Sequence, residues 1–170
     1  MRWRDEVAED DRQSVRQLVA STGFFSQAEQ DIAVELVEET LREGAAAGYQ
    51  FIFADAPAAN SRRLPGALRG YACFGPIPSR SGGYDLYWIA VAPSEQGHGL
   101  GRLLIEEAER RALRQGAEDM FIDTSGRAQY QPTRDFYERT GYSRYEVLRD
   151  FYAPGDDKVV YRKQLRSVTR

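Results

Sequence analysis

Cysteine and histidine, the residues that most often hold metals or close disulfides, are nearly missing from this chain of 170 residues. It has one of each, Cys73 and His98. A lone cysteine can form neither an internal disulfide nor a cysteine-rich zinc site, and such scarcity fits a reducing cytosol. The N-terminal segment is charged and shows no apolar core of a secretory signal. No apolar run approaches the ~20 residues needed to cross a bilayer. We therefore expect a soluble, cytoplasmic protein with no metal and no membrane partner.

An excess of positive charge is also absent. The chain has 23 Lys and Arg against 26 Asp and Glu, a formal charge of −3 and a pI near 5.3. Binding to a phosphate backbone requires a basic face, so we expect no nucleic-acid partner. Hydrophobic residues make up 42% of the chain. That supply and this length suit one core, and we expect a single domain over residues 1–170.

The spacing of apolar residues predicts alternating strands and helices. A capping box of Ser26 and Glu29 opens the second helix, which stops at Gly44 or Gly48. Pro154-Gly155 suits a type II turn between the last two strands. The composition of segment 55–65, rich in Ala, Pro, Asn, Ser and Arg, predicts a loop. Strands are expected over 3–7, 49–54, 68–74, 84–92, 119–124, 142–152 and 158–163, with the other helices over 10–20, 100–115 and 132–140. The order β-α-α-β-β-β-α-β-α-β-β predicts an α/β layered (α+β) domain with a mixed sheet.

The third predicted helix has an apolar side that should pack on the sheet, and charged residues elsewhere. The inward residues are expected to be Leu103, Leu104, Ala108 and Leu113.

The turn before that helix contains the most informative pattern. Three glycines, Gly97, Gly99 and Gly101, stand between a strand and a helix. Glycines allow unusual backbone angles and close approach, so several N–H groups can point at one anion. The first N–H groups of the helix and its positive dipole end act in the same direction. This arrangement predicts a pyrophosphate cradle.

Two common phosphate loops do not fit this turn. A Walker loop ends in Gly-Lys-Ser/Thr, whereas this chain has Gly101-Arg102-Leu103. A dinucleotide-binding fingerprint counted from Gly99 needs glycine or alanine where Leu104 stands, and counted from Gly97 it meets Arg102.

The turn instead resembles the signature of the GNAT superfamily of acyl-CoA-dependent N-acetyltransferases, Gln/Arg-x-x-Gly-x-Gly/Ala. Here the residues are Gln96-Gly97-His98-Gly99-Leu100-Gly101. The preceding Val91-Ala92-Pro93 is similar to the strand-ending Val-x-Pro of the family. Further on, Phe136-Tyr137-Glu138-Arg139-Thr140-Gly141-Tyr142 resembles its Phe-Tyr-x-x-x-Gly-Phe/Tyr segment. The element order is also that of the family, whose sheet is mixed, mostly antiparallel and covered by helices on both faces.

The resemblance implies acetyl-CoA as co-substrate and a small-molecule or peptide amine as acceptor. In the family, backbone N–H groups of the turn hold the CoA pyrophosphate, and the end of the preceding strand pairs with the pantetheine arm and polarises the thioester carbonyl. The cofactor-binding residues implied are Ile89, Ala90, Val91, Gln96, Gly97, His98, Gly99, Leu100, Gly101 and Arg102. The sequence leaves the acyl chain length and the oligomeric state open, a homodimer included.

Two side chains are candidates for the proton transfers. Tyr137 stands where the tyrosine of the family protonates the leaving thiolate, and a phenol of pKa ~10 near a thiol of ~8.5 can donate by hydrogen bond or transfer. Asp85 lies six residues before Val91, a spacing that places both on one strand face. Some family members place a carboxylate base at this offset, so Asp85 is the candidate base, directly or through water. Asp123, at the end of the next strand, competes with it.

Other reactive or charged residues have simpler interpretations. The backbone of His98 should matter more than its ring, because the residue lies in the cradle. Cys73 should be a buried apolar side chain. Asp156 and Asp157 follow the Pro-Gly turn and are expected to be hairpin charges, although attraction of a cationic substrate is an alternative. A CoA-binding sensor or interaction module without turnover is the alternative to an enzyme, and it would need neither Tyr137 nor a carboxylate at 85.

Overall fold

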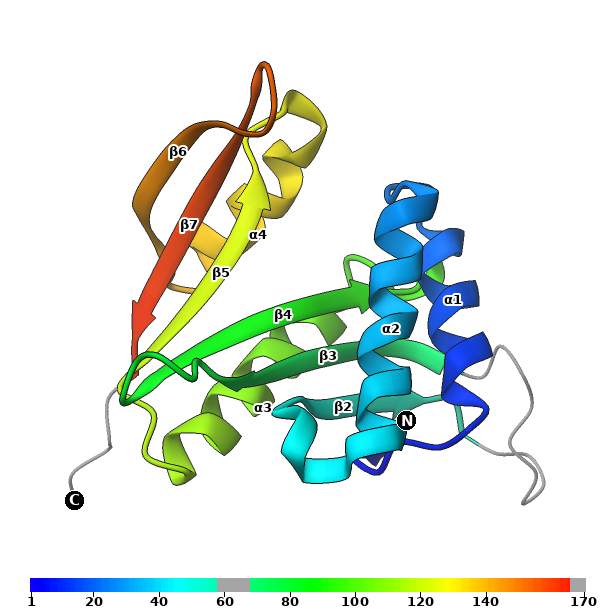
Figure 1. Ribbon diagram of the computed structural model, residues 1–170. Helices are drawn as coiled ribbons and strands as arrows, with labels where there is room; N and C mark the ends of the chain where they lie inside the picture. The colour runs from blue at the N-terminus through cyan, green and yellow to red at the C-terminus, as the bar shows by residue number, and fades with distance from the viewer. Residues whose placement is uncertain (58–67, 166–170) are drawn as a thin grey trace. The chain divides into compact units, whose positions relative to one another are not determined.

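The structure, a computed structural model, describes residues 1–57 and 68–165. Its helices and strands follow the predicted order (Figure 1): β1 (Arg2–Arg4), α1 (Asp11–Ser21), α2 (Gln27–Glu43), β2 (Gln50–Asp55), β3 (Leu68–Pro76), β4 (Gly83–Val91), α3 (Leu100–Arg114), β5 (Asp119–Ser125), α4 (Gln131–Arg139), β6 (Ser143–Ala153) and β7 (Asp156–Gln164). Most of the predicted loop over 55–65 lies outside the described residues. No helix among the described residues is long and apolar enough to span a membrane.

The local signals that place helix and hairpin ends are confirmed. At the start of α2 the Ser26 hydroxyl accepts from the Glu29 N–H at 3.2 Å, and the Glu29 carboxylate accepts from the Ser26 N–H at 2.7 Å. Gly44 is the residue that ends α2. Gly155 has a φ of 79°, the left-handed conformation that a type II turn requires at its third residue.

The described strands form a mixed sheet in the order β1-β2-β3-β4-β5-β7-β6. The pairs β1–β2, β2–β3, β5–β7 and β6–β7 are antiparallel, and β4–β5 is parallel. The parallel pairing is short, because it joins only Gly83–Asp85 of β4 to 119–121 of β5. Asp85 is therefore the last residue of β4 that pairs with β5. The mixed, mostly antiparallel sheet predicted from the sequence is confirmed.

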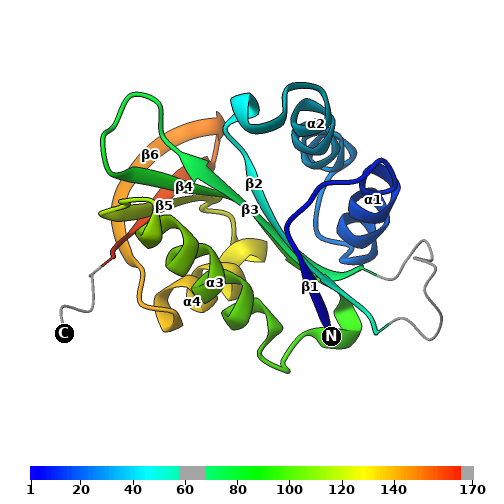
Figure 2. The same ribbon diagram turned by 90° about the horizontal axis from the view of Figure 1, so that it is seen from below.

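The described residues fall into two compact units. The first takes its residues from Met1–Gly75 and Trp88–Ala108, and the second from Pro76–Tyr87 and Glu109–Arg170. In the first unit, α1 and α2 cover one side of β2 and β3, and α3 lies on the other (Figure 2). In the second unit, α4 packs on β7, where the Tyr137 and Tyr161 rings lie 5.9 Å apart between centroids.

Helix α3 buries a narrower stripe than the sequence predicted. Leu104 and Ala108 are fully buried as expected, but Leu103 is 52% exposed and its inward placement was wrong. Leu113 is half-buried. The reason is the 3.6-residue period, which turns Leu103 about 100° away from Leu104. The buried stripe consists of Leu100, Leu104, Ile105, Ala108 and Ala112.

A glycine in β3 allows α3 to approach the sheet. A Cβ built on Gly70 would lie 3.1 Å from the side chains of both Leu100 and Leu104, and 3.2 Å from the Ala90 carbonyl oxygen. We expect Gly70→Val to lower the free energy of unfolding by about 1–3 kcal/mol, because the added methyl groups overpack this contact. Urea unfolding measures the change. Gly70→Ala, which adds only the Cβ, is the comparison variant and should lose less stability than Gly70→Val. Unchanged stability in the valine variant would show that α3 shifts without cost.

Candidate active site

The turn that links β4 to α3 is tied back to the sheet at two points. The N–H of Ala92 donates to the Arg69 carbonyl at 2.8 Å, which continues the contact between β3 and β4. The side-chain amide of Gln96 donates to the Val91 carbonyl at 3.2 Å. The first residue of the signature therefore fixes the turn to the last residue of β4.

Two of the three signature glycines adopt backbone angles that other residues rarely take. Gly97 has a φ of 78° and Gly99 a φ of 87°. A Cβ built at either position would meet nothing within 4 Å, so these glycines serve the backbone conformation and leave open space above it. Residues 96–99 are all exposed.

Five backbone N–H groups of this turn find no acceptor in the described part of the chain: those of Gly97, Gly99, Leu100, Gly101 and Arg102. The first helical bond of α3 is the one from the Leu103 N–H to the Gly99 carbonyl, at 3.1 Å. Unpaired N–H groups and the positive end of a helix attract anions. The predicted cradle residues thus lie together, and their open donors fit a pyrophosphate.

Asp85 is half-buried on the short parallel pair of the second unit. Among the described residues its carboxylate has neither an ion pair nor a side-chain hydrogen bond. Burial, and next the negative charge of Asp123, raise its pKa to about 6, while Lys158 acts in the opposite direction. A carboxylate with this pKa is ionised at neutral pH and can still accept a proton, as a general base must.

Asp123, the competing candidate, already has a cationic partner. Its carboxylate lies 3.0 Å from the Lys158 ammonium, and its side chain is 43% exposed. The same ammonium lies 4.6 Å from the centroid of the Phe151 ring. Of the two carboxylates, Asp85 is the one without an ion pair.

Tyr137 lies in α4, almost fully buried among the rings of Phe136, Tyr142 and Tyr161. Burial, and to a lesser extent Tyr161, raises its pKa well above that of an ordinary tyrosine. The phenol therefore stays neutral and keeps its O–H as a donor at any working pH. Its hydroxyl makes no hydrogen bond to the described residues, so the donor is available to another group.

A set of polar contacts that the sequence did not reveal holds the surroundings of Tyr137. Glu109 accepts from the Tyr142 hydroxyl at 2.9 Å and from Lys163 Nζ at 2.7 Å. Lys163 also donates to the Thr140 carbonyl at 2.9 Å. These partners are 33 and 54 residues apart from Glu109 in sequence, and no local pattern pairs them.

A buried arginine fixes the segment between β5 and α4. Arg134 is 5% exposed, and its Nη1 donates to the carbonyls of Ser125 at 2.6 Å and Arg127 at 3.0 Å. Its Nη2 donates to Gln131 at 2.8 Å. No sequence motif singled out this residue, although its position three residues before Tyr137, on the same helix side, was a usable signal.

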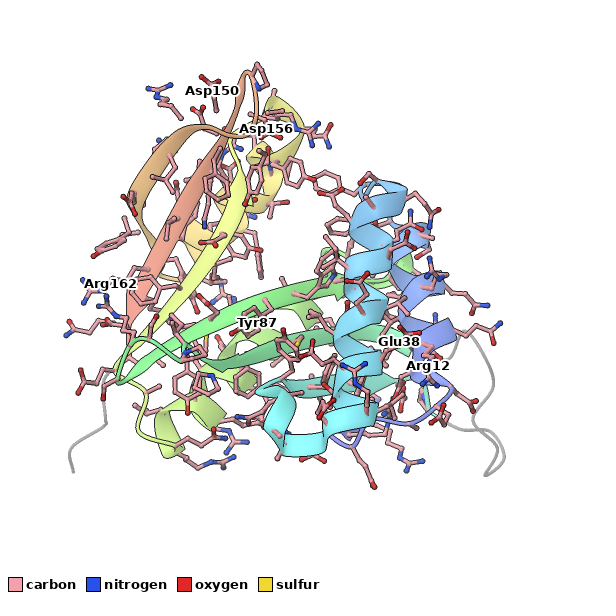
Figure 3. All side chains as sticks on the ribbon, in the orientation of Figure 1. Arg12, Glu38, Tyr87, Asp150, Asp156 and Arg162 are labelled. Atoms are coloured by element: carbon pink, nitrogen blue, oxygen red, sulfur yellow. The ribbon has the colours of Figure 1, made fainter. Side chains whose placement is uncertain are left out.

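The hairpin charges are satisfied within the second unit. Asp156 accepts from the Ser125 hydroxyl and pairs with Arg127 at 3.2 Å, and Asp157 accepts from the Asp150 N–H at 2.9 Å. Figure 3 shows Asp150 and Asp156 near the tip of the β6–β7 hairpin and Arg162 toward the other end of β7. These contacts support a structural role for Asp156 and Asp157.

The lone cysteine and the lone histidine lie in opposite surroundings. Cys73 is fully buried, as expected, and burial raises its thiol pKa well above the ordinary value. His98 is exposed in the turn. Within residues 1–57 and 68–165, no group of three or more His, Cys, Asp or Glu side chains is placed to hold a metal ion.

Comparison with known proteins identifies the class. A model of the acetyltransferase (GNAT) family matches residues 43–142. The structure is similar to that of a GNAT-family protein from Desulfovibrio desulfuricans, with 47% identity, a TM-score of 0.88, and coverage of 97% of this chain and 99% of the other. This chain belongs to the GNAT family and is an acetyltransferase of that class. The resemblance seen in the sequence is confirmed.

Two more distant relatives add detail. "Uncharacterized N-acetyltransferase YuaI" of Bacillus subtilis (strain 168) is 39% identical over 59 residues, so the match spans 34% of each chain. An aminoglycoside 6'-N-acetyltransferase complexed with coenzyme A has a TM-score of 0.68 at 16% identity, covering 100% of both chains. The latter likeness shows the shared fold.

Proposed function

We propose that this protein, as a single N-acetyltransferase domain over residues 1–170, moves an acetyl group from acetyl-CoA to a primary amine by direct attack within a ternary complex. The observation that carries the proposal is the turn 96–102, exposed over residues 96–99, with its five open N–H groups directly after the strand end of the family signature. Such a cradle matches the pyrophosphate of CoA.

The first unit would bind the co-substrate. Backbone N–H groups from Gly97 to Arg102 hold the pyrophosphate, and the backbone of Ile89 to Val91 pairs with the pantetheine arm and polarises the thioester carbonyl. Family membership supports both roles, and the link from Gln96 to Val91 keeps the turn and the strand end in one local structure.

The side chains of the second unit would move the protons. Asp85 takes a proton from the acceptor ammonium, directly or through water, and frees the nitrogen lone pair. The nitrogen then attacks the thioester carbon and the C–N bond forms. As the tetrahedral adduct collapses, the C–S bond breaks, and the nitrogen loses its second proton to the leaving sulfur or to solvent, which leaves a neutral amide. The leaving thiolate receives the hydrogen bond of the Tyr137 hydroxyl. The raised pKa of Tyr137 favours a hydrogen bond over full transfer, because the phenol is a weaker acid than the thiol.

The acceptor is a primary amine. The aminoglycoside substrate belongs to the relative named above, and the 16% identity extends only to the fold. A small-molecule amine or a peptide amine both satisfy the chemistry of Asp85.

Replacing Gly101 by glutamate tests the cradle. Gly101 lies in the first turn of α3 without a positive φ, so the backbone accepts the change. A carboxylate there opposes the pyrophosphate by charge and bulk, and we expect CoA affinity to fall about tenfold or more, roughly 1.4 kcal/mol. Calorimetric titration measures it, with Gly101→Ala as the matched control for loss of glycine alone. Unchanged affinity in a folded glutamate variant would remove this turn from the site.

A further inference from the structure

One face of the second unit brings a lysine to the candidate carboxylates. In the sheet register, Asp85 lies opposite Phe121, and Asp123 follows two residues later on the same face of β5. Lys158 of β7 lies opposite Ser125, again on that face. The 3.0 Å contact from Lys158 to Asp123 confirms that the side chains meet there.

The charges around Asp119 on this face are already paired with one another. Arg162 donates to Asp119 at 2.9 and 3.1 Å, and Arg80 lies 3.5 Å from the same carboxylate. Arg80 and Arg162 also cover the rings of Phe121 and Tyr145. Besides burial, the charges that shift the pKa of Asp85 are those of Asp123, which raises it, and Lys158, which lowers it.

Lys158 is held in place from two sides. Its ammonium lies between the Asp123 carboxylate and the Phe151 ring, and its side chain is 21% exposed. Both a carboxylate and an aromatic face stabilise an ammonium in proteins. The fold thus fixes one positive charge beside two negative ones, which leaves a single uncompensated carboxylate.

We propose that Lys158 is a positioning residue that sets the charge of the acceptor site: it neutralises Asp123, so that Asp85 alone receives the acceptor ammonium and the site selects amines with one positive charge. This inference rests on the proposed function. A second ammonium on the acceptor would be repelled by the positive charge of Lys158. Without that lysine, the same ammonium could pair with the Asp123 carboxylate.

Removing the lysine should have two measurable effects. Asp123 would become available to a second cation, so kcat/KM for diamines should rise relative to kcat/KM for monoamines. The two carboxylates would also repel each other without compensation, which raises the pKa of Asp85. We expect a rise of about one pH unit in Lys158→Gln and little change in Lys158→Arg, which keeps the charge. Lys163→Gln is the matched control, since Lys163 is the other lysine of the chain and pairs with Glu109.

The first measurement follows the Asp85 carboxyl carbon by NMR as a function of pH in the wild type and the three variants. We expect the titration midpoint of Asp85 in Lys158→Gln to lie about one pH unit above the midpoints in the wild type, Lys158→Arg and Lys163→Gln. At pH 6 this corresponds to an ionised fraction lower by about fivefold. An Asp85 midpoint that is the same in Lys158→Gln and the wild type would overturn the counterion role.

The second measurement compares butylamine with 1,4-diaminobutane, which differ by one ammonium group. The ratio of diamine to monoamine kcat/KM should rise roughly three- to tenfold in Lys158→Gln and stay unchanged in Lys163→Gln. If neither amine is turned over, the ratio of their dissociation constants from the same NMR signals takes its place. An unchanged ratio contradicts charge selection. Absence of amine-dependent thiol release with every amine would instead reject the proposed function, while the Asp85 titration would still decide the role of Lys158.

Discussion

Replacing Tyr137 by phenylalanine should lower turnover by about 10²–10⁴-fold and leave acetyl-CoA affinity near that of the wild type. The ring and its packing among Phe136, Tyr142 and Tyr161 are retained in this variant, and only the hydroxyl is lost. That hydroxyl makes no hydrogen bond to the described residues, so its removal should cost little stability. Steady-state rates with saturating acetyl-CoA, together with calorimetric titration of CoA, measure the two quantities.

Tyr161→Phe is the matched control for that experiment. Tyr161 is also buried and lies next to Tyr137, but its hydroxyl donates to Glu138 at 3.0 Å. We expect this variant to lose about 0.5–1.5 kcal/mol of stability through the broken hydrogen bond, with turnover within about threefold of wild type. Full turnover in Tyr137→Phe would reduce Tyr137 to a packing residue.

Asp85→Asn should give a loss of activity that depends on pH. In the wild type, kcat/KM for the acceptor should rise as pH rises through about 6, because Asp85 must be ionised to accept a proton. The variant should lack this acidic limb and lose about 10²-fold or more near pH 7. The loss should shrink toward pH 9–10, where an amine of pKa ~10 supplies more of its free base.

The same substitution should raise stability, and the sign follows from the raised pKa. A carboxyl whose pKa is 3.8 in the unfolded chain and about 6 in the folded one binds its proton more tightly when folded, so stability falls as pH rises between these values. Asparagine removes that cost. We expect Asp85→Asn to be more stable by about 1 kcal/mol at pH 8, after discounting for solvent screening, and equal to wild type near pH 3. Thermal unfolding at the two pH values measures it.

Asp123→Asn distinguishes the two candidate bases. If Asp85 is the base, this variant should keep an acidic limb and shift it to lower pH, because a neighbouring negative charge is removed. A larger and pH-dependent loss in Asp123→Asn would transfer the role to Asp123. A uniform loss at all pH values in Asp85→Asn would mean that Asp85 positions the acceptor.

Much of the fold was predictable because its signals are local. The capping box at Ser26, the Pro154-Gly155 turn and the glycine turn before α3 each act within a few residues, and each lies where the sequence placed it. The error at Leu103 has a local cause as well, since one residue of helix phase decides between a buried and an exposed side chain.

The electrostatics of the candidate site could not be predicted in the same way. Lys158 meets Asp123, and Glu109 meets both Tyr142 and Lys163, only because strands and helices distant in sequence are joined by the sheet. The sequence offered Asp85 as the candidate base and Asp123 as its competitor. Their difference lies in which one has an ion pair, and that depends on the register of β5 and β7.

The most direct test of the central claim is thiol release from acetyl-CoA, measured with and without each member of a panel of amino acids, monoamines, polyamines, aminoglycosides and peptides. Product mass is recorded in parallel. We predict release that requires an amine, with one acetyl group added to that amine and none retained on the protein. CoA binding at the turn 96–102 without amine-dependent release across the whole panel would contradict this account and support a CoA-binding module without turnover.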